Sequence, residues 1–479
     1  MNFKLVFKVT GKTLMLEAVA MILPLLVGVI YGESPRPFLL AILITAVVGA
    51  LLSLPRANTK LYARDGFFAV GLIWILFGVF GALPFYFCGY FESYVDCLFE
   101  CISGFTTTGA SILTAVEGLP YGILFWRSFT HWLGGMGVLV LTIALLPSLG
   151  ARSAFLMQAE SPGPIKSKLV PKTAQSSKIL YGIYLGLTVI MVLCLLLTGM
   201  PLYDSVVNAF ATAGTGGFSV KNLSIAAYNN PAAEIIISVF MLLFSVNFTV
   251  YFLILCGKWK RAFKSDELRF FLCLVGFSIL AITFNINGFH LDGLGLSLRQ
   301  ALFQVATIVS TTGFATTDFN LWPELSRCIL VLLMFIGACA GSTGGGMKCA
   351  RVLLLFKSLR QEIHETIHPR SVHVVKLDGQ VVEDRALRKA HIFFAAYLLI
   401  LALGILLVSL DNYSFTTTTT AVIACLSNIG PGLDLVGPMG NYSIFSDLSK
   451  LVLSLCMIIG RIEIFPILVL FSRNAWKRS

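Results

Sequence analysis

The sequence predicts an all-α polytopic membrane protein, and three observations support this fold class. Of the 479 residues, 57% are hydrophobic and only 12% are charged, with a mean hydropathy of +0.86. A soluble chain of this size would need far more polar surface to cover its core. Many apolar runs reach the ~18–20 residues needed to cross a hydrocarbon layer of about 30 Å. Glycine motifs recur between these runs, which indicates an internal repeat.

The first expected element is an uncleaved membrane span. A basic start and an apolar run resemble a signal peptide, but no small-x-small cleavage site follows, and the next apolar run begins at Phe38. We therefore expect spans over 14–31 and 37–54, within an N-terminal extension of residues 1–65. Glu17 lies in the first span. We expect it at the interface near the inner end, and a proton-linked role is the alternative.

The net charge of +11 follows the membrane topology. Most of the 35 Lys and Arg residues lie in alternate segments between the spans, and the intervening segments are acidic. By the positive-inside rule the basic segments face the cytoplasm, together with both termini. This distribution argues against a nucleic-acid partner. The basic clusters occupy residues 4–12, 56–64, 152–178, 258–269, 348–389 and 473–478.

The rest of the chain repeats one pattern four times. Each repeat has an entering span, an outer segment with a short apolar helix and a glycine motif, and a returning span. With the N-terminal pair this predicts ten crossings. The repeats cover 66–176, 177–266, 267–388 and 389–479. The entering spans are expected near 67–87, 178–199, 268–287 and 390–410, and the returning spans begin near Pro120, Pro231, Trp322 and Ser446.

The four glycine motifs lie on the acidic, outer side. They read "FTTTGAS" (105–111), "TGGFS" (215–219), "STTGFATTDF" (310–319) and "SNIGPGL" (427–433). Their aligned glycines recur at intervals of roughly 100 residues. The apolar stretch before each motif is about a dozen residues long, too short to span the membrane, so it predicts a half-helix that enters from outside. The run "TTTTT" (416–420) belongs to the fourth half-helix.

Four such loops at membrane depth would define a pore, because irregular backbone is tolerated there only where protein or a water-filled path lines it. The C-terminal ends of the half-helices would favour a cation, and glycine and threonine loops can turn carbonyl oxygens toward it. The loops lack the carboxylates that calcium or magnesium would require, which favours a monovalent cation. Glycine-rich outer turns without a ligand are the alternative. The candidate binding residues are Thr107, Thr108, Gly109, Thr215, Gly216, Gly217, Thr311, Thr312, Gly313, Asn428, Ile429 and Gly430.

These loops resemble those of the TrkH/KtrB/HKT superfamily of potassium transporters, along essentially the whole chain. Further segments that resemble the family are "WRSFTHWLGGMGVLVL" (126–141), "GACAGSTGGGMK" (337–348), "HPRSVHVVKLDGQVV" (368–382) and "GRIEIFPILVLF" (460–471). The extra N-terminal pair of spans resembles the TrkH branch. In the plant-type branch a serine at the first filter glycine accompanies sodium preference, so Gly109 favours potassium.

The resemblance implies a fold and a function. The fold is four tandem helix–pore-loop–helix repeats around a pseudo-fourfold pore, preceded by two extra transmembrane helices. The function is potassium uptake through a filter of four glycine loops in the bacterial inner membrane, and not an enzyme activity. The implied partners are a second copy of the chain, membrane lipid and a cytoplasmic TrkA-like nucleotide-binding ring. The alternatives are a sodium- or proton-coupled potassium symporter and a less selective monovalent cation transporter.

The third returning segment is too long for one membrane helix. From Trp322 to Arg360 a single helix would measure about 60 Å, twice the membrane thickness. The glycine-rich loop 337–348 supplies the break. The resemblance implies that this loop is a gate, and a simple kink is the alternative. The candidate gating residues are Gly341, Ser342, Thr343, Gly344, Gly345, Gly346, Lys348 and Arg461.

Two basic residues need separate explanations. Arg461 lies in an apolar returning span, where an arginine is costly and indicates a functional contact. Glu463 lies on a different helix face and is a poor partner, so we expect Arg461 to contact carbonyls of the 337–346 loop. Snorkelling toward the inner interface is its alternative. We expect Lys348 to be an interfacial anchor, and a gating role is the alternative.

Other motifs carry less information. "HETIH" (364–368) matches H-E-x-x-H, but it lies in a basic linker without a further ligand, so no metalloprotease is expected. The chain has no dinucleotide-binding fingerprint, so any nucleotide control must come from a partner. The 11 cysteines are scattered and read as small buried hydrophobes. Arg127 and His131 are expected to pack or hydrogen bond near the filter.

Overall fold

The structure is a computed structural model that describes residues 3–55, 63–137, 173–288, 293–371 and 374–471. Within these ranges the chain is mainly helical, and the predicted all-α class is confirmed. Its strands are β1 (Lys376–Leu377) and β2 (Gln380–Val381), which form a two-stranded antiparallel hairpin. Several basic residues used to predict the topology lie outside the described residues. They are Arg56, Lys60, Arg152, Lys166, Lys168, Lys172, Arg473, Lys477 and Arg478.

The N-terminal extension is a pair of closely packed helices. α1 (Phe3–Ala20) and α2 (Ile22–Ile30) together form one membrane-length segment, which begins earlier than the expected residue 14. α3 (Arg36–Ser53) packs along α1. A Cβ atom placed on Gly11 would lie 2.5 Å from the carbonyl oxygen of Gly49, so the two backbones are in direct contact. Small residues permit this close approach in membrane helices.

Four long helices enter the four repeats. Together with the two N-terminal segments they make six segments long and apolar enough to cross a membrane. Large apolar side chains on them are exposed, as expected for surfaces that face lipid; Phe277 is 71% exposed and Leu399 is 66% exposed. The entering helices are α4 (Ala63–Gly81) with its extension α5 (Leu83–Cys88), α10 (Thr173–Leu197), α15 (Asp266–Ile286) and α19 (Asp384–Val408).

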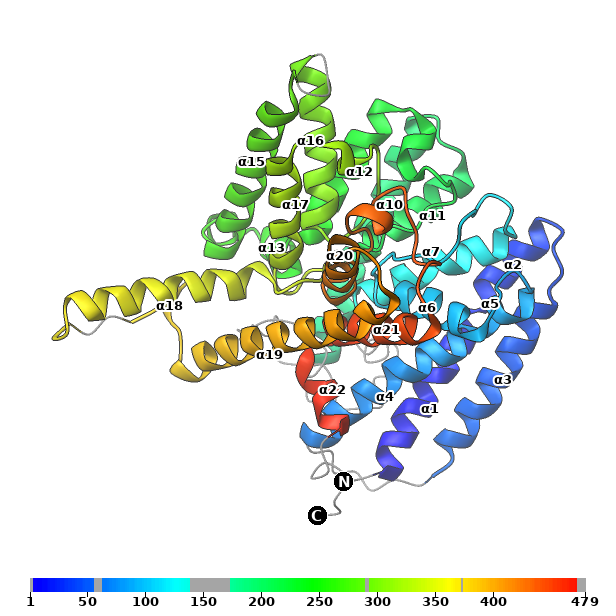
Figure 1. Cartoon of the computed structure of the whole chain (residues 1–479). Coiled ribbons are helices and arrows are strands. Elements are labelled where there is room, and N and C mark those ends of the chain that lie inside the picture. Colours follow the sequence, from blue (N-terminus) through cyan, green and yellow to red (C-terminus); the bar gives the residue numbers. More distant parts are fainter. Residues whose placement is uncertain (1–2, 56–62, 138–172, 289–292, 372–373, 472–479) are drawn as a thin grey trace.

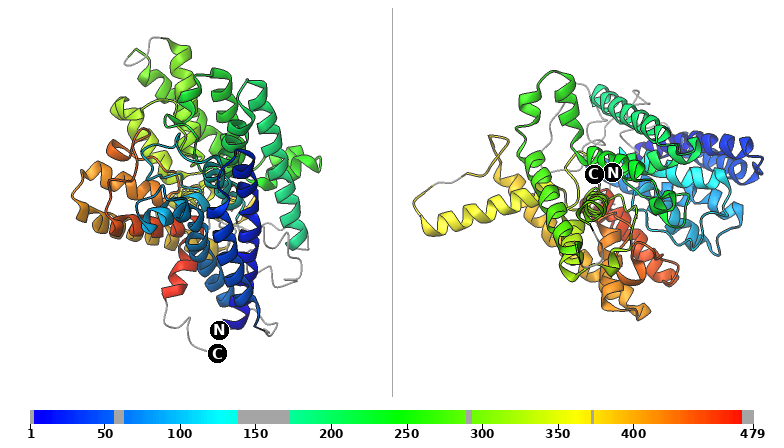
Figure 2. Two further views of the ribbon diagram at one scale, coloured as in Figure 1. Left: turned by 90° about the vertical axis from the view of Figure 1, so that its right-hand side faces the viewer. Right: turned by 90° about the horizontal axis from the view of Figure 1, so that it is seen from above.

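A half-helix follows each entering helix, as the sequence predicted. At 1.5 Å per residue the half-helices are about 18–24 Å long, shorter than the hydrocarbon layer. They surround the centre of the molecule, where the four loops meet (Figures 1 and 2). The half-helices are α6 (Tyr94–Phe105), α11 (Leu202–Gly214), α16 (Leu294–Val309) and α20 (Phe415–Leu426).

The returning segments are broken more often than the sequence predicted. They are short helices, and at least three of them are broken, whereas we had predicted a break only in the third. After α12 the chain bends by 91° into α13. It turns there because the Asn247 side chain accepts a hydrogen bond from the Thr249 N–H (2.9 Å) and starts a new helix. The fourth segment breaks at Glu463, which has a positive φ of 63°. The helices are α7 (Tyr121–Gly135), α12 (Pro231–Ser245), α13 (Phe248–Leu255), α17 (Glu324–Ile336), α21 (Asp447–Arg461) and α22 (Ile464–Phe471).

The remaining helices lie in the connections. α18 (Cys349–Ile367) follows the break in the third returning segment and projects away from the body of the molecule (Figure 1). The start of α1 and the end of α22 lie at the same end of the molecule (Figures 1 and 2). The shorter elements are α14 (Trp259–Ala262), η2 (Ser224–Tyr228), η3 (Phe319–Leu321), η4 (Ser409–Asp411) and η5 (Asp434–Val436).

Hydrogen bonds join the outer segments into a closed ring. Each outer segment is bonded to that of the next repeat, and the fourth is bonded back to the first. This cyclic order is what four tandem units around one axis require. The bonds run from Val116 N to Asn222 Oδ1 (2.7 Å), Ala226 N to Ala315 O (3.2 Å), Asp434 N to Asn320 Oδ1 (2.9 Å) and Tyr442 N to Ser111 O (2.8 Å).

The N-terminal extension is attached to the first repeat by a helix cap. The Glu33 carboxylate, in the turn between α2 and α3, accepts hydrogen bonds from the N–H groups of Tyr121 and Gly122, the latter at 2.9 Å. These are orphan donors at the start of α7. The Tyr31 ring stacks on the Tyr121 ring, with centroids 4.1 Å apart. The extension therefore holds the helix that supports the central loops.

We expect Glu33→Gln to lower the thermal unfolding midpoint of the purified protein in detergent. The variant keeps the side-chain size but removes the negative charge at the positive end of α7, and losing a cap costs about 0.5–2 kcal/mol. Glu92→Gln, on an exposed part of the next outer segment, is the control and should leave the midpoint unchanged. Equal midpoints for the two variants would contradict this role of Glu33.

Candidate functional site

The four central loops share one unusual backbone conformation. In each loop the first and third residues have positive φ angles, whereas the middle residue does not. Glycine adopts this region without cost, but threonine does so rarely. Strain of this kind is retained where the surroundings impose it, and it points to a functional role. The φ angles are 56° and 77° at Thr107 and Gly109, 56° and 77° at Thr215 and Gly217, 60° and 87° at Thr311 and Gly313, and 55° and 92° at Asn428 and Gly430.

The third-position glycines close a second, inner ring. Each faces the carbonyl oxygen of the middle residue in the loop of the next repeat, and the glycine of the fourth loop faces that of the first loop. A Cβ atom on Gly109 would lie 1.8 Å from Gly216 O, so no side chain fits there. The corresponding distances are 2.1 Å from Gly217 to Thr312 O, 2.1 Å from Gly313 to Ile429 O and 2.7 Å from Gly430 to Thr108 O. The structure thus brings all four predicted loops together, and we call this set the loop ring.

A cavity of about 140 Å³ lies on the outer side of the loop ring. All four third-position glycines line it, together with outer residues such as Ser111 and Tyr442. Near the fourth loop, Ser414 and Thr417 donate hydrogen bonds to the Asp434 carboxylate (2.5 and 2.8 Å) and hold its pKa below the usual range. The Asp434 carboxylate is therefore ionised at neutral pH.

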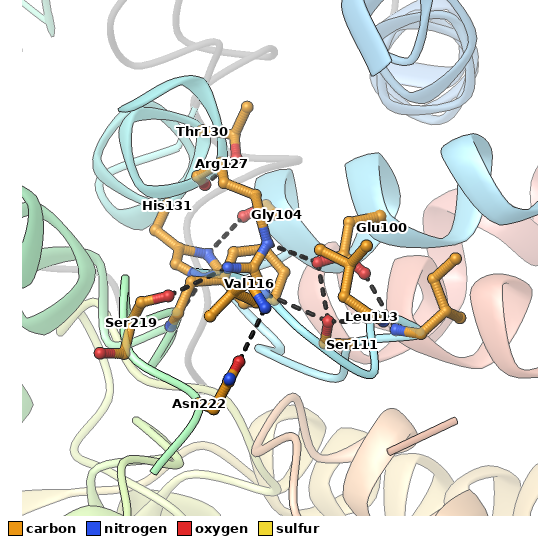
Figure 3. Close-up of polar contacts among 12 residues, drawn as sticks. Glu100, Gly104, Ser111, Leu113, Val116, Arg127, Thr130, His131, Ser219 and Asn222 are labelled. Atoms are coloured by element: carbon orange, nitrogen blue, oxygen red, sulfur yellow. Dashed lines mark hydrogen bonds and ion pairs between the residues drawn. The ribbon is translucent and has the colours of Figure 1, made fainter. Parts of the chain in front are cut away.

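Arg127 on α7 fixes the backbone around the first two loops (Figure 3). Its Nε lies 2.6 Å from Glu100 Oε1, and both side chains are buried. The guanidinium also donates to Ser219 O (3.2 Å) and Ser111 Oγ (3.2 Å). Glu100 Oε2 accepts from Ile112 N (3.0 Å). Sequence reasoning identified Arg127 as a support but missed Glu100, whose signal is a carboxylate within an apolar half-helix.

His131, one turn further along α7, supports the same loops (Figure 3). Its Nδ1 lies 2.7 Å from Gly104 O, at the end of the first half-helix, and its Nε2 accepts from Phe218 N (3.3 Å). Because Nε2 is the acceptor, Nδ1 carries the proton. The predicted hydrogen-bonding role of Arg127 and His131 agrees with this geometry.

Charged pairs also tie other repeats together. Lys450 on α21 pairs with Asp96 on α6 at 2.6 Å, and both side chains are at most 10% exposed. This pair joins the fourth repeat to the first. Arg299 on α16 pairs with Glu234 on α12 at 3.2 Å, where the arginine is 32% exposed.

The glycine-rich segment 337–348 lies against the loop ring on the side opposite the cavity; we call it the gate segment. Gly345 N donates to Thr311 Oγ1 (2.7 Å). A Cβ atom on Gly345 would lie 2.4 Å from Ser427 O, and one on Gly344 would lie 2.8 Å from Ser310 O. The gate segment thus contacts the third and fourth loops at their inner ends.

The bend between α12 and α13 holds one side of the gate segment. Cys339 N donates to Ser245 O (3.1 Å), and Phe248 N donates to Gly341 O (3.1 Å). The Thr343 hydroxyl donates to a further carbonyl there, that of Phe244 (3.1 Å). These bonds use backbone groups that the break in the second returning segment leaves free.

Glu267, in the first turn of α15, binds both ends of the gate segment. Its Oε1 accepts from Ala340 N (2.6 Å) and from Ala350 N (3.1 Å), and the residue is 8% exposed. Sequence reasoning missed this residue. An acidic residue in the first turn of a helix is an ordinary feature, so no local signal distinguished it.

Arg461 contacts the gate segment, as predicted. Its guanidinium donates to Thr343 O (2.6 Å) and also to Gly134 O (2.6 Å) and Gly135 O (2.5 Å) at the end of α7. The contact with α7 was not anticipated. Arg461 therefore joins the gate segment to the first repeat.

Two polar residues occupy positions that differ from the expectations. Lys348 is 4% exposed, and its ammonium group donates to Gly344 O within the gate segment, so an interfacial anchor is wrong. Glu17 is 1% exposed and lies beside Gly81 and Cys101, not at the inner interface. The reason is that α1 packs along α4 and carries Glu17 up to the first half-helix.

The H-E-x-x-H motif is the remaining motif from the sequence. "HETIH" occupies the last turns of α18 and its C-cap. Among the described residues, no group of three or more His, Cys, Asp or Glu side chains could hold a metal ion.

Comparisons with known proteins agree along the whole chain. The sequence model of the TrkH family, described as "Cation transport protein", matches residues 35–478. The "Trk system potassium uptake protein TrkH" of Salmonella typhimurium is 36% identical over 488 residues, which cover 100% of both chains. TrkI of Halomonas elongata, another Trk system potassium uptake protein, is 32% identical, over 99% of this chain and 97% of its own length. The crystal structure of the potassium transporter TrkH from Vibrio parahaemolyticus superposes with a TM-score of 0.90 at 34% identity, covering 100% of both chains.

We expect Arg127→Gln to destabilise the protein strongly. The variant leaves the Glu100 carboxylate buried without its charge partner, which costs about 3–5 kcal/mol. Arg299→Gln breaks a more exposed pair and should cost less than about 1 kcal/mol. Unfolding curves of both variants in the same detergent give the comparison, and a loss for Arg127→Gln no larger than that for Arg299→Gln would contradict the assignment.

Proposed function

This chain belongs to the TrkH family of cation transport proteins, and on that premise we propose that it takes up potassium ions across the bacterial inner membrane. The observation that carries the proposal is the closed rotation of glycine–carbonyl contacts in the loop ring. It concentrates backbone oxygens from four loops around one axis. The ions pass along that axis, from the outer cavity toward the gate segment.

The chemistry of the loop ring suits a large monovalent cation. Carbonyl oxygens carry only partial charges, and several together replace the hydration shell of potassium. The four half-helices direct the negative ends of their dipoles toward the ring. The filter then consists of the twelve residues at 107–109, 215–217, 311–313 and 428–430. The pore is built from the four repeats 66–176, 177–266, 267–388 and 389–479.

We further propose that the gate segment closes the inner end of this path. Its contacts with Ser427 and Thr311 place it directly against the ring. Arg461 stabilises the closed arrangement because it binds the gate segment and α7 at once. The gating residues are Gly341, Ser342, Thr343, Gly344, Gly345, Gly346, Lys348 and Arg461.

Regulation of the gate is assigned to a partner. The projecting helix α18 begins directly after the gate segment (Figure 1). A protein that binds α18 and moves it would therefore also move the gate segment. We propose that two copies of the chain form a homodimer in the lipid bilayer, with both termini cytoplasmic. A TrkA-like nucleotide-binding ring docks on their basic inner segments. The chain itself binds potassium, without a nucleotide, and performs transport with no enzymatic step.

One observation favours a second candidate, a proton-coupled potassium symporter on the same scaffold. Neither carboxyl oxygen of Glu17 has a hydrogen-bond partner among the described residues, although the side chain is fully buried. A buried, unpaired carboxyl group is a candidate proton-binding group. Potassium uptake that accelerates under an inward proton gradient, at constant membrane potential, would support this alternative.

The direct test is rubidium uptake into proteoliposomes, with and without competing sodium. We expect the wild-type protein to accumulate rubidium in preference to sodium. Gly109→Ser should lower the ratio of rubidium to sodium uptake at least about tenfold, because its Cβ atom displaces the carbonyl of Gly216 from the ring. Gly118→Ser is the matched control, since a Cβ atom there meets no atom within 4 Å. No rubidium flux under any gradient would overturn the proposed function.

Arg461→Gln should raise basal rubidium flux in the absence of a partner protein. The substitution removes the charge-assisted hydrogen bonds that join the gate segment, at Thr343 O, to the end of α7. Such a bond contributes about 1.5–3 kcal/mol, so an increase of about tenfold is expected. Arg327→Gln, in a partly exposed pair with Glu324, is the control. Unchanged flux in Arg461→Gln would count against the gating role.

A further inference from the structure

The first-position side chains of the four loops have different partners, although their backbones match. All four residues are fully buried. Thr215 Oγ1 donates to its neighbour Gly214 O (2.6 Å), and Asn428 Nδ2 donates to Thr108 Oγ1 (3.0 Å) and Met457 O (2.8 Å). The loops are therefore equivalent in shape but not in the availability of their side-chain oxygens.

Thr107 and Thr311 make the informative pair. Both have the same φ to within a few degrees, and both precede Thr-Gly. Thr107 Oγ1 has no hydrogen-bond partner among the described residues. Thr311 Oγ1, in contrast, accepts the N–H of Gly345 at 2.7 Å. The gate segment thus donates a hydrogen bond to the Thr311 hydroxyl oxygen, whereas the equivalent oxygen of Thr107 accepts none among the described residues.

The backbone of the gate segment also fills the space beside the Thr311 hydroxyl. A Cβ atom on Gly344 would lie 3.3 Å from Thr311 Oγ1 and 2.8 Å from Ser310 O. A cation at this end of the ring would need lone pairs of the same oxygen. An N–H group already aimed at that oxygen presents a positive partial charge, which repels the ion.

We propose that the gate segment and a monovalent cation at the inner end of the loop ring compete for the Thr311 hydroxyl oxygen. The inference rests on the proposed function, because it requires that cations reach the ring. By linkage, a cation bound there favours displacement of the gate segment, and displacement of the gate segment strengthens cation binding by the same factor. Transported ions on the inner side thereby help to keep their own path open.

The test uses the full-length protein in proteoliposomes and follows rubidium flux as the rubidium concentration on the gate side is raised. The wild-type flux per unit of driving force should rise with that concentration. Thr311→Val keeps the β-branched shape but removes the hydroxyl. Its basal flux should rise about fivefold to tenfold, because a buried hydrogen bond that holds the gate is lost. The dependence on gate-side rubidium should disappear.

Three comparisons separate this role from a purely structural one. Thr107→Val removes the matching hydroxyl of the first loop, which accepts no hydrogen bond among the described residues. Its flux should fall, and its dependence on gate-side rubidium should remain. Thr311→Ser keeps the hydroxyl and should restore the dependence. Thr311→Ala gives a second hydroxyl-free variant with the behaviour of Thr311→Val, should the valine fail to fold.

The outcomes distinguish a failure of the proposed competition from a failure of the proposed function. Rubidium flux in the wild-type protein, with the same concentration dependence in Thr311→Val and Thr107→Val, overturns the competition and leaves the proposed function intact. Absence of flux in the wild-type protein overturns the proposed function and, with it, this inference.

Discussion

The close approach of four glycines to four carbonyl oxygens is the constraint on which the rest of the structure depends. Backbone groups at this depth have no water to satisfy them, so they must be held by protein. Arg127, His131 and the Lys450–Asp96 pair all act on the half-helices or on the loops behind that ring. The N-terminal extension contributes through its cap on α7. These supporting side chains are polar and buried because apolar packing alone does not fix the direction of a carbonyl group. Hydrogen bonds and ion pairs from such side chains hold the loop backbone in position.

The sequence predicted the repeated parts of this architecture well. The first half-helix was expected in the dozen apolar residues before the first glycine motif, and α6 lies there. Length and composition explain this success, since a dozen apolar residues between two long runs cannot cross the membrane. The glycine motifs were also placed correctly, because a glycine that must face a neighbouring backbone tolerates no replacement. The contact of Arg461 with the gate segment was predicted from the free-energy cost of an arginine in an apolar span.

What the sequence did not reveal depends on contacts between distant segments. Glu267 binds groups that lie more than seventy residues away in the chain, and its own surroundings resemble any helix start. The bend after α12 arises at Asn247, where a local cap and the gate segment act together. Lys348 and Glu17 were misplaced for the same reason: hydropathy gives the depth of a helix, but the face that a side chain occupies depends on its neighbours.

The four quarters of the ring belong to one polypeptide, and this has an evolutionary consequence. In an assembly of four identical chains, every substitution is made four times and symmetry is preserved. Here Asn428 stands where the other three loops have threonine, and the gate segment contacts the third and fourth loops. Each quarter is therefore free to diverge, so that ion coordination, mechanical support and control can be refined by separate mutations.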